Sequence, residues 1–593
     1  METVGDCYVA AAGLPEPRDD HAVAAANFAR AIMKKISELT KKLEVSLGPD
    51  TADLKLRVGM HSGQVTAGVL RGERARFQLF GDTVNTAARM ETTGMGSQIQ
   101  ITLVTADLLV KGGKGHWIKP REETVYVKGK GDIRTFWLNT KINERNTSRN
   151  SNASKWAEMN CVEMTPADQG MEGSDTGSEL GFDEGEETMD KMKRLVEWNI
   201  EILKHLLQQI VAARVDSKHA PKLLAPIENQ LGVGSTVLEE FQPIIYLNRF
   251  DAEDLNKRKD PDSINLGEAA ISQLRDFLTT IALMYRDNPF HNFEHASHVT
   301  ASVRKLLSRI VSVHDNGLQG RDNHNINLVE LAGHSYGITS DPLTQFAVVF
   351  SAVIHDVDHP GVTNAQLVIE NTRSAKIYKR SIAEQNSVDL AWEVLMSPDY
   401  VDLRACIYSC EEELKRFRQL VVNTVMATDI CDKELQALRK ARWDAAFSAT
   451  QPDPSPELAQ DRKATIVIEH LIQASDVAHT MQHWQVYKRW NENFFMEMYG
   501  AYQAGRAAAD PSKGWYEGEI GFFDFYVIPL AKKLESCGVF GVSSHEYLNY
   551  AVSNREEWVR RGEQIVKEYI EKYEASQIGS RPAVLVDSKH KPT

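Results

Sequence analysis

The chain of 593 residues lacks any apolar run of about 18 residues, the length at which a segment becomes a candidate membrane span. It also lacks the basic and then apolar N-terminal pattern of a secretory signal peptide. Its six cysteines include no Cys-x-x-Cys pair, which is typical of scattered reduced thiols rather than of a disulfide framework. These absences predict a soluble, cytoplasmic protein for this chain.

Positive charge is also in deficit. The chain has 68 lysines and arginines against 82 aspartates and glutamates, a formal net charge of -14. A general nucleic-acid binder usually carries a basic surface, so the composition argues against a nucleic-acid partner. It does not exclude a small anionic substrate, because bound metal ions can reverse the potential within a site.

The length exceeds what one hydrophobic core supports, so two or more domains are expected. Residues 1–140 mix strand-like and helix-like segments, which predicts an α/β or α+β layer. Residues 141–186 are polar and then acidic, with too few apolar side chains to fold, and are predicted to be a linker. Residues 187–575 have helical periodicity almost throughout, which predicts a large all-α domain. Residues 576–593 are predicted to be a disordered tail.

Histidines and aspartates follow apolar helical segments at several distant places in the all-α region. The set comprises His291, His295, His355, Asp356, Asp358, His359 and Asp476. Neutral imidazoles suit zinc-like ions, and carboxylates suit magnesium or bridge two ions. Each residue alone could be a surface charge or a hydrogen-bonded core histidine. Together they would incur a large desolvation cost without a metal, so the set predicts metal-assisted hydrolysis at a phosphoryl centre.

Most of residues 190–575 closely resemble the class I cyclic-nucleotide phosphodiesterases. The motifs FHNFEHA, IHDVDHPGVTN, MATD, ASDVAH and GFFDFYVIPL stand in the order of that family. The resemblance implies an all-α, HD-type catalytic domain that hydrolyses 3′,5′-cyclic nucleotides to 5′-monophosphates. HD-type phosphohydrolases of other nucleotides share the ligand pattern, but the GFFDF and HNFEH motifs favour the cyclic-nucleotide enzyme. A non-enzymatic cyclic-nucleotide sensor would require the loss of a metal ligand, and none is missing.

The same resemblance implies the role of each residue. The tighter, zinc-like ion would be bound by His295, His355, Asp356 and Asp476. Asp356 would bridge to a second ion, magnesium or manganese, and a hydroxide between the ions would attack phosphorus. His291 would protonate the departing 3′ oxygen. Glu384 matches an acid that orients His291 or metal-bound water, and His359 and Thr428 are expected to support the ligands.

The end of the site that would receive the purine departs from the family pattern. Phe522 matches the aromatic clamp, and His479 stands where the family often has asparagine. Glu519 stands at the position of the family's glutamine. Glutamine offers a donor and an acceptor, whereas an ionised glutamate only accepts. Guanine presents two donors there and adenine presents a bare N1 acceptor, so Glu519 predicts a preference for cGMP over cAMP.

Residues 1–140 resemble the class III nucleotide cyclases, closest to the guanylate cyclases. The motifs are METVGDCYVAAAGLP, RVGMHSGQVTAGVL, FQLFGDTVNTAARME and VKGKG. The resemblance implies an incomplete α+β, ferredoxin-like palm in which Asp6 is a metal ligand and Lys128 neutralises the triphosphate of GTP. Asn85 and Arg89 would position the ribose and stabilise the transition state. Glu2 matches the guanine-selecting acid.

Two departures leave the role of this region open. The family's opening strand, with a further metal-binding aspartate, is not included in the chain, and Gln78 stands where guanylate cyclases commonly have cysteine. Such domains work as dimers with complementary groups from opposite protomers, so a homodimer through this domain is expected. The region could be an active cyclase in a bifunctional protein or a cyclase-derived dimerisation or nucleotide-sensing module. It could also belong to a longer, membrane-associated protein.

Overall fold

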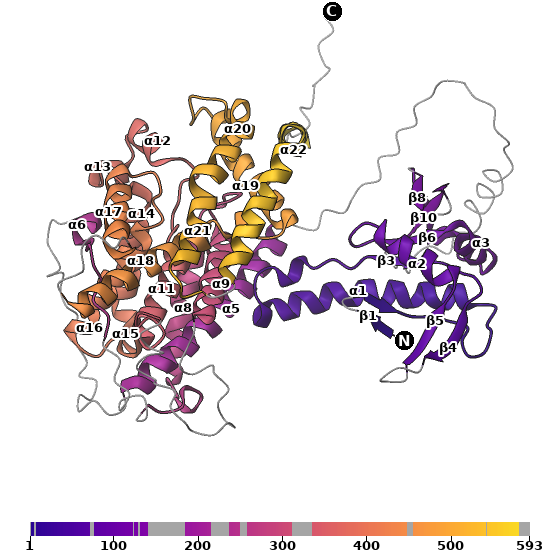
Figure 1. Cartoon of the computed structure of the whole chain (residues 1–593), viewed down its shortest axis with the longest axis horizontal. Coiled ribbons are helices and arrows are strands. Elements are labelled where there is room, and N and C mark those ends of the chain that lie inside the picture. The colour runs from indigo at the N-terminus through magenta and orange to yellow at the C-terminus, as the bar shows by residue number, and fades with distance from the viewer. Residues whose placement is uncertain are drawn as a thin grey trace, which may run out of the picture. The chain divides into compact units, whose positions relative to one another are not determined.

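The computed structural model describes residues 2–4, 7–70, 76–122, 124–127, 131–139, 184–214, 236–248, 258–310, 335–447, 455–540 and 543–579. The chain forms two compact units, Met1–Phe182 and Asp183–Thr593 (Figure 1). Most of the predicted linker and of the predicted tail lies outside the described residues. Helix α5 (Glu184–Arg214) begins inside the predicted linker, and α22 (Ser543–Gly579) continues into the predicted tail.

The first unit is built around a four-stranded sheet. Its order is β3 (Val58–Met60), β6 (Ile99–Thr102), β10 (Thr135–Leu138) and β7 (Ile118–Pro120). Strands β3 and β6 are parallel, and β10 is antiparallel to both of its neighbours. Three antiparallel hairpins join β1 (Glu2–Val4) to β2 (Cys7–Val9), β4 (Thr66–Leu70) to β5 (Arg76–Phe80), and β8 (Val125–Val127) to β9 (Gly131–Ile133). The predicted α+β architecture is confirmed.

Helices complete this unit. They are α1 (His21–Leu47), α2 (Asp82–Thr92) and α3 (Leu103–Lys111), with 3-10 turns η1 (Thr51–Asp53) and η2 (Gly115–Trp117). Ala22, Ala26 and Ala29 recur at helical spacing and bury one face of α1 in the core formed with Ile101 of the sheet. Gly59 lets β3 lie against α2, because a Cβ there would fall 2.0 Å from the Glu91 nitrogen.

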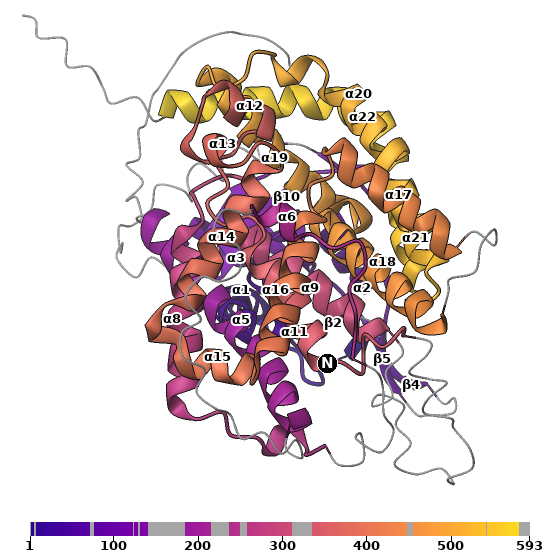
Figure 2. The same cartoon turned by 90° about the vertical axis from the view of Figure 1, so that its left-hand side faces the viewer.

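The described part of the second unit consists of helices and short turns, without a strand (Figure 2). Between α5 and α22 the helices are α6 (Val237–Glu240), α8 (Glu268–Met284), α9 (Phe293–Arg309), α11 (Pro342–Ile354), α12 (Asn364–Ile369), α13 (Arg373–Ile377), α14 (Ile382–Met396), α15 (Val401–Ile407), α16 (Glu411–Met426), α17 (Lys433–Phe447), α18 (Pro456–Asp476), α19 (Trp484–Gln503), α20 (Trp515–Phe522) and α21 (Ile528–Ser536). The shorter segments are η3 (Pro261–Ser263), η4 (Pro398–Tyr400), η5 (Ala478–Met481), η6 (Pro511–Lys513) and the π-helical η7 (Phe523–Val527). The predicted all-α architecture is confirmed.

Helix α11 lies at the centre of this unit. It starts at Pro342, a residue favoured in the first helical turn, and every residue from Phe346 to Ile354 is buried. It packs against α5, α9 and α16, which surround it in Figure 2. The apolar run therefore fixes the end of α11 within the core, and the polar residues that follow Ile354 start from a rigid position.

Candidate active site

Three helix ends in the second unit bring the four predicted metal ligands together. His295 lies in the first turn of α9, and Asp476 is the last residue of α18. His355 and Asp356 directly follow α11. The Asn292 side chain accepts a hydrogen bond from the backbone N–H of His295 and so caps α9, which starts at Phe293. His291 therefore lies before the helix.

The ligand atoms converge closely. His295 Nε2 lies 3.1 Å from Asp476 Oδ1 and 3.8 Å from Asp356 Oδ2. His355 Nε2 lies 3.2 Å from Asp356 Oδ2 and 3.5 Å from Asp476 Oδ1. Both imidazoles are buried. Two nitrogen and two oxygen donors around one point match the donor set that zinc-like ions take in proteins.

The carboxylates of this cluster favour a positive charge. Burial lowers the pKa of His355, but Asp356 and Asp476 raise it well above its usual value, so a metal ion would displace a proton from this ring. His355 Nδ1 lies 3.0 Å from the Ala352 carbonyl, and its buried Nε2 faces the carboxylates of Asp356 and Asp476. Burial disfavours the ionised form of Asp356, but the adjacent His355 more than offsets it and lowers the pKa of this carboxyl well below its usual range. Burial likewise opposes ionisation of Asp476, and its hydrogen bonds with His295 and His355 lower its pKa overall. A divalent ion would bind His355 Nε2 and the anionic oxygens together.

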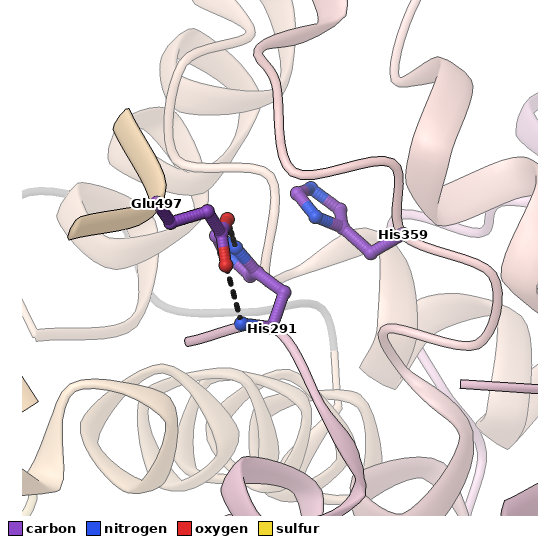
Figure 3. A group of neighbouring side chains, drawn as sticks. All are labelled: His291, His359 and Glu497. Carbon is purple, nitrogen blue, oxygen red and sulfur yellow. Dashed lines mark hydrogen bonds and ion pairs between the residues drawn. The ribbon is translucent and has the colours of Figure 1, made fainter. Parts of the chain in front are cut away.

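His291 lies beside this cluster, just before α9 (Figure 3). Its Nδ1 is hydrogen-bonded to Oε1 of Glu497, a buried residue of α19. Oε2 of Glu497 accepts the backbone N–H groups of Phe290 (2.9 Å) and His291 (3.0 Å). Burial lowers the pKa of His291, but the Glu497 carboxylate outweighs it and the net shift is upward. The arrangement holds a proton on an imidazole at the edge of the predicted metal site.

His359 lies against the ring of His291, as Figure 3 shows, with centroids 3.8 Å apart and planes at 34°. Burial, and then the charge of His291, lower the pKa of His359 to about 3, so its ring is neutral. Its backbone carbonyl accepts a hydrogen bond from Asn288. The structure therefore places His359 beside the proposed acid, where sequence reasoning had expected only support for the ligands.

Glu384 and Thr428 lie on other helices. Glu384, in the first turn of α14, accepts a 3.0 Å hydrogen bond from Asn364. Burial, and then the charge of Asp429, raise the pKa of Glu384 to about 8. Thr428 donates a hydrogen bond to the Val425 carbonyl. Of the two roles expected of Glu384, the orientation of His291 is taken in the structure by Glu497.

Sequence reasoning missed Glu497. It is 206 residues away from His291 and lies in the segment NFFMEMY, where a lone glutamate on an amphipathic helix is usually a solvent-exposed residue. The one available signal was its place among aromatic residues that belong inside the core.

Glu519 and Phe522 lie one turn apart on α20, so they share a face of that helix. Tyr487 donates a 2.8 Å hydrogen bond to Glu519 Oε2. Burial raises the pKa of Glu519 to about 7, partly opposed by the Tyr487 hydrogen bond. The Phe522 ring stacks on Tyr526 at 5.3 Å.

His479, expected beside the base, lies in η5 with its ring against Phe290 and Trp490. It lines a small cavity together with His298 and Asp476. Burial lowers the pKa of His479 to about 3. The structure thus places His479 in one cavity with His295 and Asp476, and Glu519 and Phe522 on α20.

Two residues predicted for the first unit can be placed. Asn85 and Arg89 are both exposed and lie four residues apart on α2, so they point from one face of the helix. Asp6, Lys128 and the side chain of Glu2 lie outside the described residues.

Across the described helices, none combines the length and the apolar character needed to cross a bilayer.

Comparisons with known proteins match the two units separately. Residues 1–140 match the family model of the adenylate and guanylate cyclase catalytic domain. A receptor-type guanylate cyclase of Caenorhabditis elegans (gcy-28) is 42% identical over 138 residues, which are 23% of this chain and 10% of that protein. The guanylate cyclase soluble subunit beta-2 of Rattus norvegicus is 40% identical over 144 residues, 24% of this chain and 20% of that protein. The chain thus spans a tenth to a fifth of the length of these relatives.

Residues 290–539 match the family model of the 3′5′-cyclic nucleotide phosphodiesterases. A solved structure, the phosphodiesterase domain of a RhoPDE fusion protein from the choanoflagellate Salpingoeca rosetta, is similar at 19% identity over 56% of this chain and 97% of that chain. Its TM-score of 0.39 is too low to support an inference about this chain.

Both resemblances expected from the sequence are confirmed. The four converging ligands and the His291–Glu497 pair fall inside the second matched range, and Asn85 and Arg89 fall inside the first. The chain joins a catalytic domain of the adenylate and guanylate cyclase family, at residues 1–140, to a domain of the 3′5′-cyclic nucleotide phosphodiesterase family, at residues 290–539.

Proposed function

We propose that the second unit hydrolyses 3′,5′-cyclic nucleotides to 5′-monophosphates, with cGMP favoured over cAMP. The observation that carries this proposal is the convergence of two buried histidines and two carboxylates next to the hydrogen-bonded His291–Glu497 pair. A metal-binding cluster beside a protonated imidazole combines a site for an anionic phosphodiester with a proton for its leaving group.

Two divalent ions would complete the site. His295, His355, Asp356 and Asp476 would hold zinc, and Asp356 would share a second ion, magnesium or manganese. When bound, these ions would supply Lewis-acid activation of the phosphoryl centre and of the attacking water.

The side chains of this domain perform the remaining steps. Glu497 fixes the His291 ring through Nδ1, which leaves Nε2 as the nitrogen that can give a proton to the departing 3′ oxygen. Without that proton the oxygen would leave as a poor alkoxide. Burial shields the Glu497 carboxylate from water, since its side chain is 3% exposed, while the His291 side chain is 18% exposed.

Glu519 supports the preference for guanine. The ionised carboxylate accepts hydrogen bonds from guanine N1–H and the exocyclic amine, whereas adenine N1 would face it as a second acceptor. We expect Glu519→Gln to lower the ratio of kcat/KM for cGMP to that for cAMP by about tenfold or more, because a mismatched buried polar contact costs about 1–3 kcal/mol. The measurement is made near pH 8, and unchanged selectivity would contradict this role.

The activity itself is tested by incubating the purified chain with cGMP, cAMP, GTP and ATP in separate reactions and identifying the products. We expect 5′-GMP from cGMP, and 5′-AMP from cAMP more slowly. Intact cyclic nucleotides after incubation with zinc and magnesium would refute the proposal.

We propose further that the first unit forms a homodimer that binds GTP across its interface. Asn85 and Arg89 are exposed on one face of α2, as expected of groups that complete a site on a second protomer. The unit would then act as a cyclase or as a dimerisation module for the phosphodiesterase. Light scattering of the purified chain should give twice the monomer mass, and a monomer at micromolar concentration would contradict the proposal.

A chain that hydrolyses cGMP would hide any cGMP that it makes. Cyclase activity is therefore best sought in the Asp476→Ala variant, in which hydrolysis is expected to be lost. Accumulation of cGMP from GTP and manganese, abolished by adding Arg89→Ala, would identify a working cyclase. GTP binding without cGMP would favour the dimerisation module.

A further inference from the structure

We propose that base selection in this phosphodiesterase depends on the protonation of Glu519: the ionised carboxylate admits guanine, and the protonated carboxyl admits adenine as well. This inference rests on the proposed function, in which Glu519 faces the purine. At high pH Glu519 would present the two acceptors of a carboxylate, and at low pH it would present a donor and an acceptor, as a glutamine does.

The geometry around Glu519 is fixed by Tyr487. This tyrosine is fully buried in the core, and its ring lies against Phe523 and Trp558 at 5.3 Å and 5.9 Å. Its hydroxyl donates to Glu519 Oε2 at 2.8 Å. Because Oε2 already receives a proton, the acidic proton of a neutral Glu519 belongs on Oε1. Oε1 is therefore fully available to a ligand, and Oε2 keeps a second lone pair beside the Tyr487 hydrogen bond.

The two protonation states present different hydrogen-bonding groups to the purine through Oε1 and Oε2. The ionised carboxylate offers acceptors alone, which suits guanine N1–H and its exocyclic amine. A neutral carboxyl offers one O–H donor and one carbonyl acceptor, the same pair that a glutamine amide presents. The O–H can then donate to adenine N1 while the carbonyl accepts from the adenine amine, and guanine can pair through O6 and N1–H.

The surroundings place this ionisation in the accessible pH range. Burial raises the pKa of Glu519 to about 7, and the Tyr487 hydrogen bond opposes part of that rise. Tyr487 is its one hydrogen-bond partner in the described part of the chain. Tyr487 on α19 is the one titratable group that acts on the pKa of Glu519, and Tyr569 on α22 feels the charge of Glu519 in turn. Other charged groups on the elements packed around α20 include Arg555 on α22, Asp524 on η7 and Lys513 on η6.

None of these groups neutralises Glu519. The guanidinium of Arg555 forms a bidentate ion pair with Asp524, and Lys513 is exposed. The Tyr569 hydroxyl donates to the Lys488 carbonyl, and the charge of Glu519 contributes to raising its pKa. A carboxylate without a cationic partner titrates according to its burial, so Glu519 is free to gain or lose its proton near neutral pH.

A competition assay tests the proposal. Equal concentrations of cGMP and cAMP are mixed with one enzyme sample, and the ratio of initial rates gives the ratio of the two kcat/KM values. Metal occupancy and every ionisation common to both substrates cancel in this ratio. We measure the ratio of kcat/KM for cGMP to that for cAMP between about pH 6 and about pH 8.5. At pH values above the Glu519 pKa we expect this ratio to increase with pH, approaching about tenfold per pH unit.

Two variants separate the proposal from a merely structural role. Glu519→Gln should remove the pH dependence of the ratio, because the amide does not titrate in this range. Tyr487→Phe should move the rise to higher pH, because the lost hydrogen bond no longer favours the charged form. A matched change on the same element, Lys488→Gln, removes a surface charge whose partner is Glu568 and should leave the midpoint unchanged.

The possible results distinguish a failure of pH-dependent base selection from a failure of the proposed hydrolytic activity. Hydrolysis of both nucleotides with a ratio that does not change with pH would overturn this proposal and leave the proposed function intact. A pH-dependent ratio that persists in Glu519→Gln would assign the effect to another group and also overturn it. Absence of hydrolysis at any pH would overturn the proposed function together with this inference.

Discussion

Replacing Asp476 by alanine is expected to remove the tightly bound metal and to lower kcat for cGMP by more than about 100-fold. Loss of a residue that only hydrogen-bonds to a metal ligand costs up to about 100-fold, so loss of a ligand itself should cost more. Asp476 Oδ1 lies 3.1 Å from His295 Nε2 and 3.5 Å from His355 Nε2, so one carboxylate connects both imidazoles. Its loss leaves three donors for the zinc-like ion. Metal content by mass spectrometry and steady-state kinetics on the same preparation measure the two effects.

A control separates metal binding from stability. Asp276 is an exposed carboxylate on α8, and Asp276→Ala should keep both the metal and kcat. If Asp476 served only to balance two buried histidines, its alanine variant would have a lower Tm while keeping its metal content. Retained turnover with a full complement of metal would contradict the assignment of the ligands.

The convergence of the predicted ligands could be expected from the sequence because each of them stands at the start or the end of a largely buried helix. The buried run Phe346–Ile354 fixes the position of His355, and the buried stretch that precedes Asp476 in α18 does the same from another direction. A buried helix is held in one position by its packing, so the polar residue at its end has a fixed place in the fold. The sequence pattern that marks the buried helix therefore also indicates where that residue lies. The ligands therefore converge in the structure.

The hydrogen-bond partners of the site residues come from helices that are distant in the sequence. The sequence pattern gives little information about how such helices pack against one another. Glu497 on α19 reaches His291, which lies just before α9, and Tyr487, nearly three turns earlier on α19, reaches Glu519. His479 matches a base-binding position by its place in the motif, and in the structure the η5 turn sets its ring against Phe290 and Trp490. A motif gives the position of a residue in the sequence, whereas the conformation of the turn that contains it sets the direction of its side chain.

His291→Asn is expected to lower kcat for cGMP by about 10²–10⁴-fold, the usual contribution of a positioned general acid, while the metal content stays unchanged. The reason is that His291 holds its proton through Glu497 and lies next to the ligand cluster without belonging to the four converging donors. Glu497→Gln should reduce kcat less, because the imidazole keeps a hydrogen-bonding neighbour but loses the charge that favours its protonated form.

The leaving group gives the decisive readout for this acid. A phosphodiester that releases nitrophenolate needs no proton at its departing oxygen, so His291→Asn should hydrolyse it at close to the unmodified rate, while cGMP hydrolysis remains slow. A general loss of folding or of metal would slow both substrates alike, and zinc content measured on the same sample separates these cases. Equal slowing of both substrates at full metal occupancy would show that His291 acts in binding or in activating the attacking water, and not in protonating the 3′ oxygen.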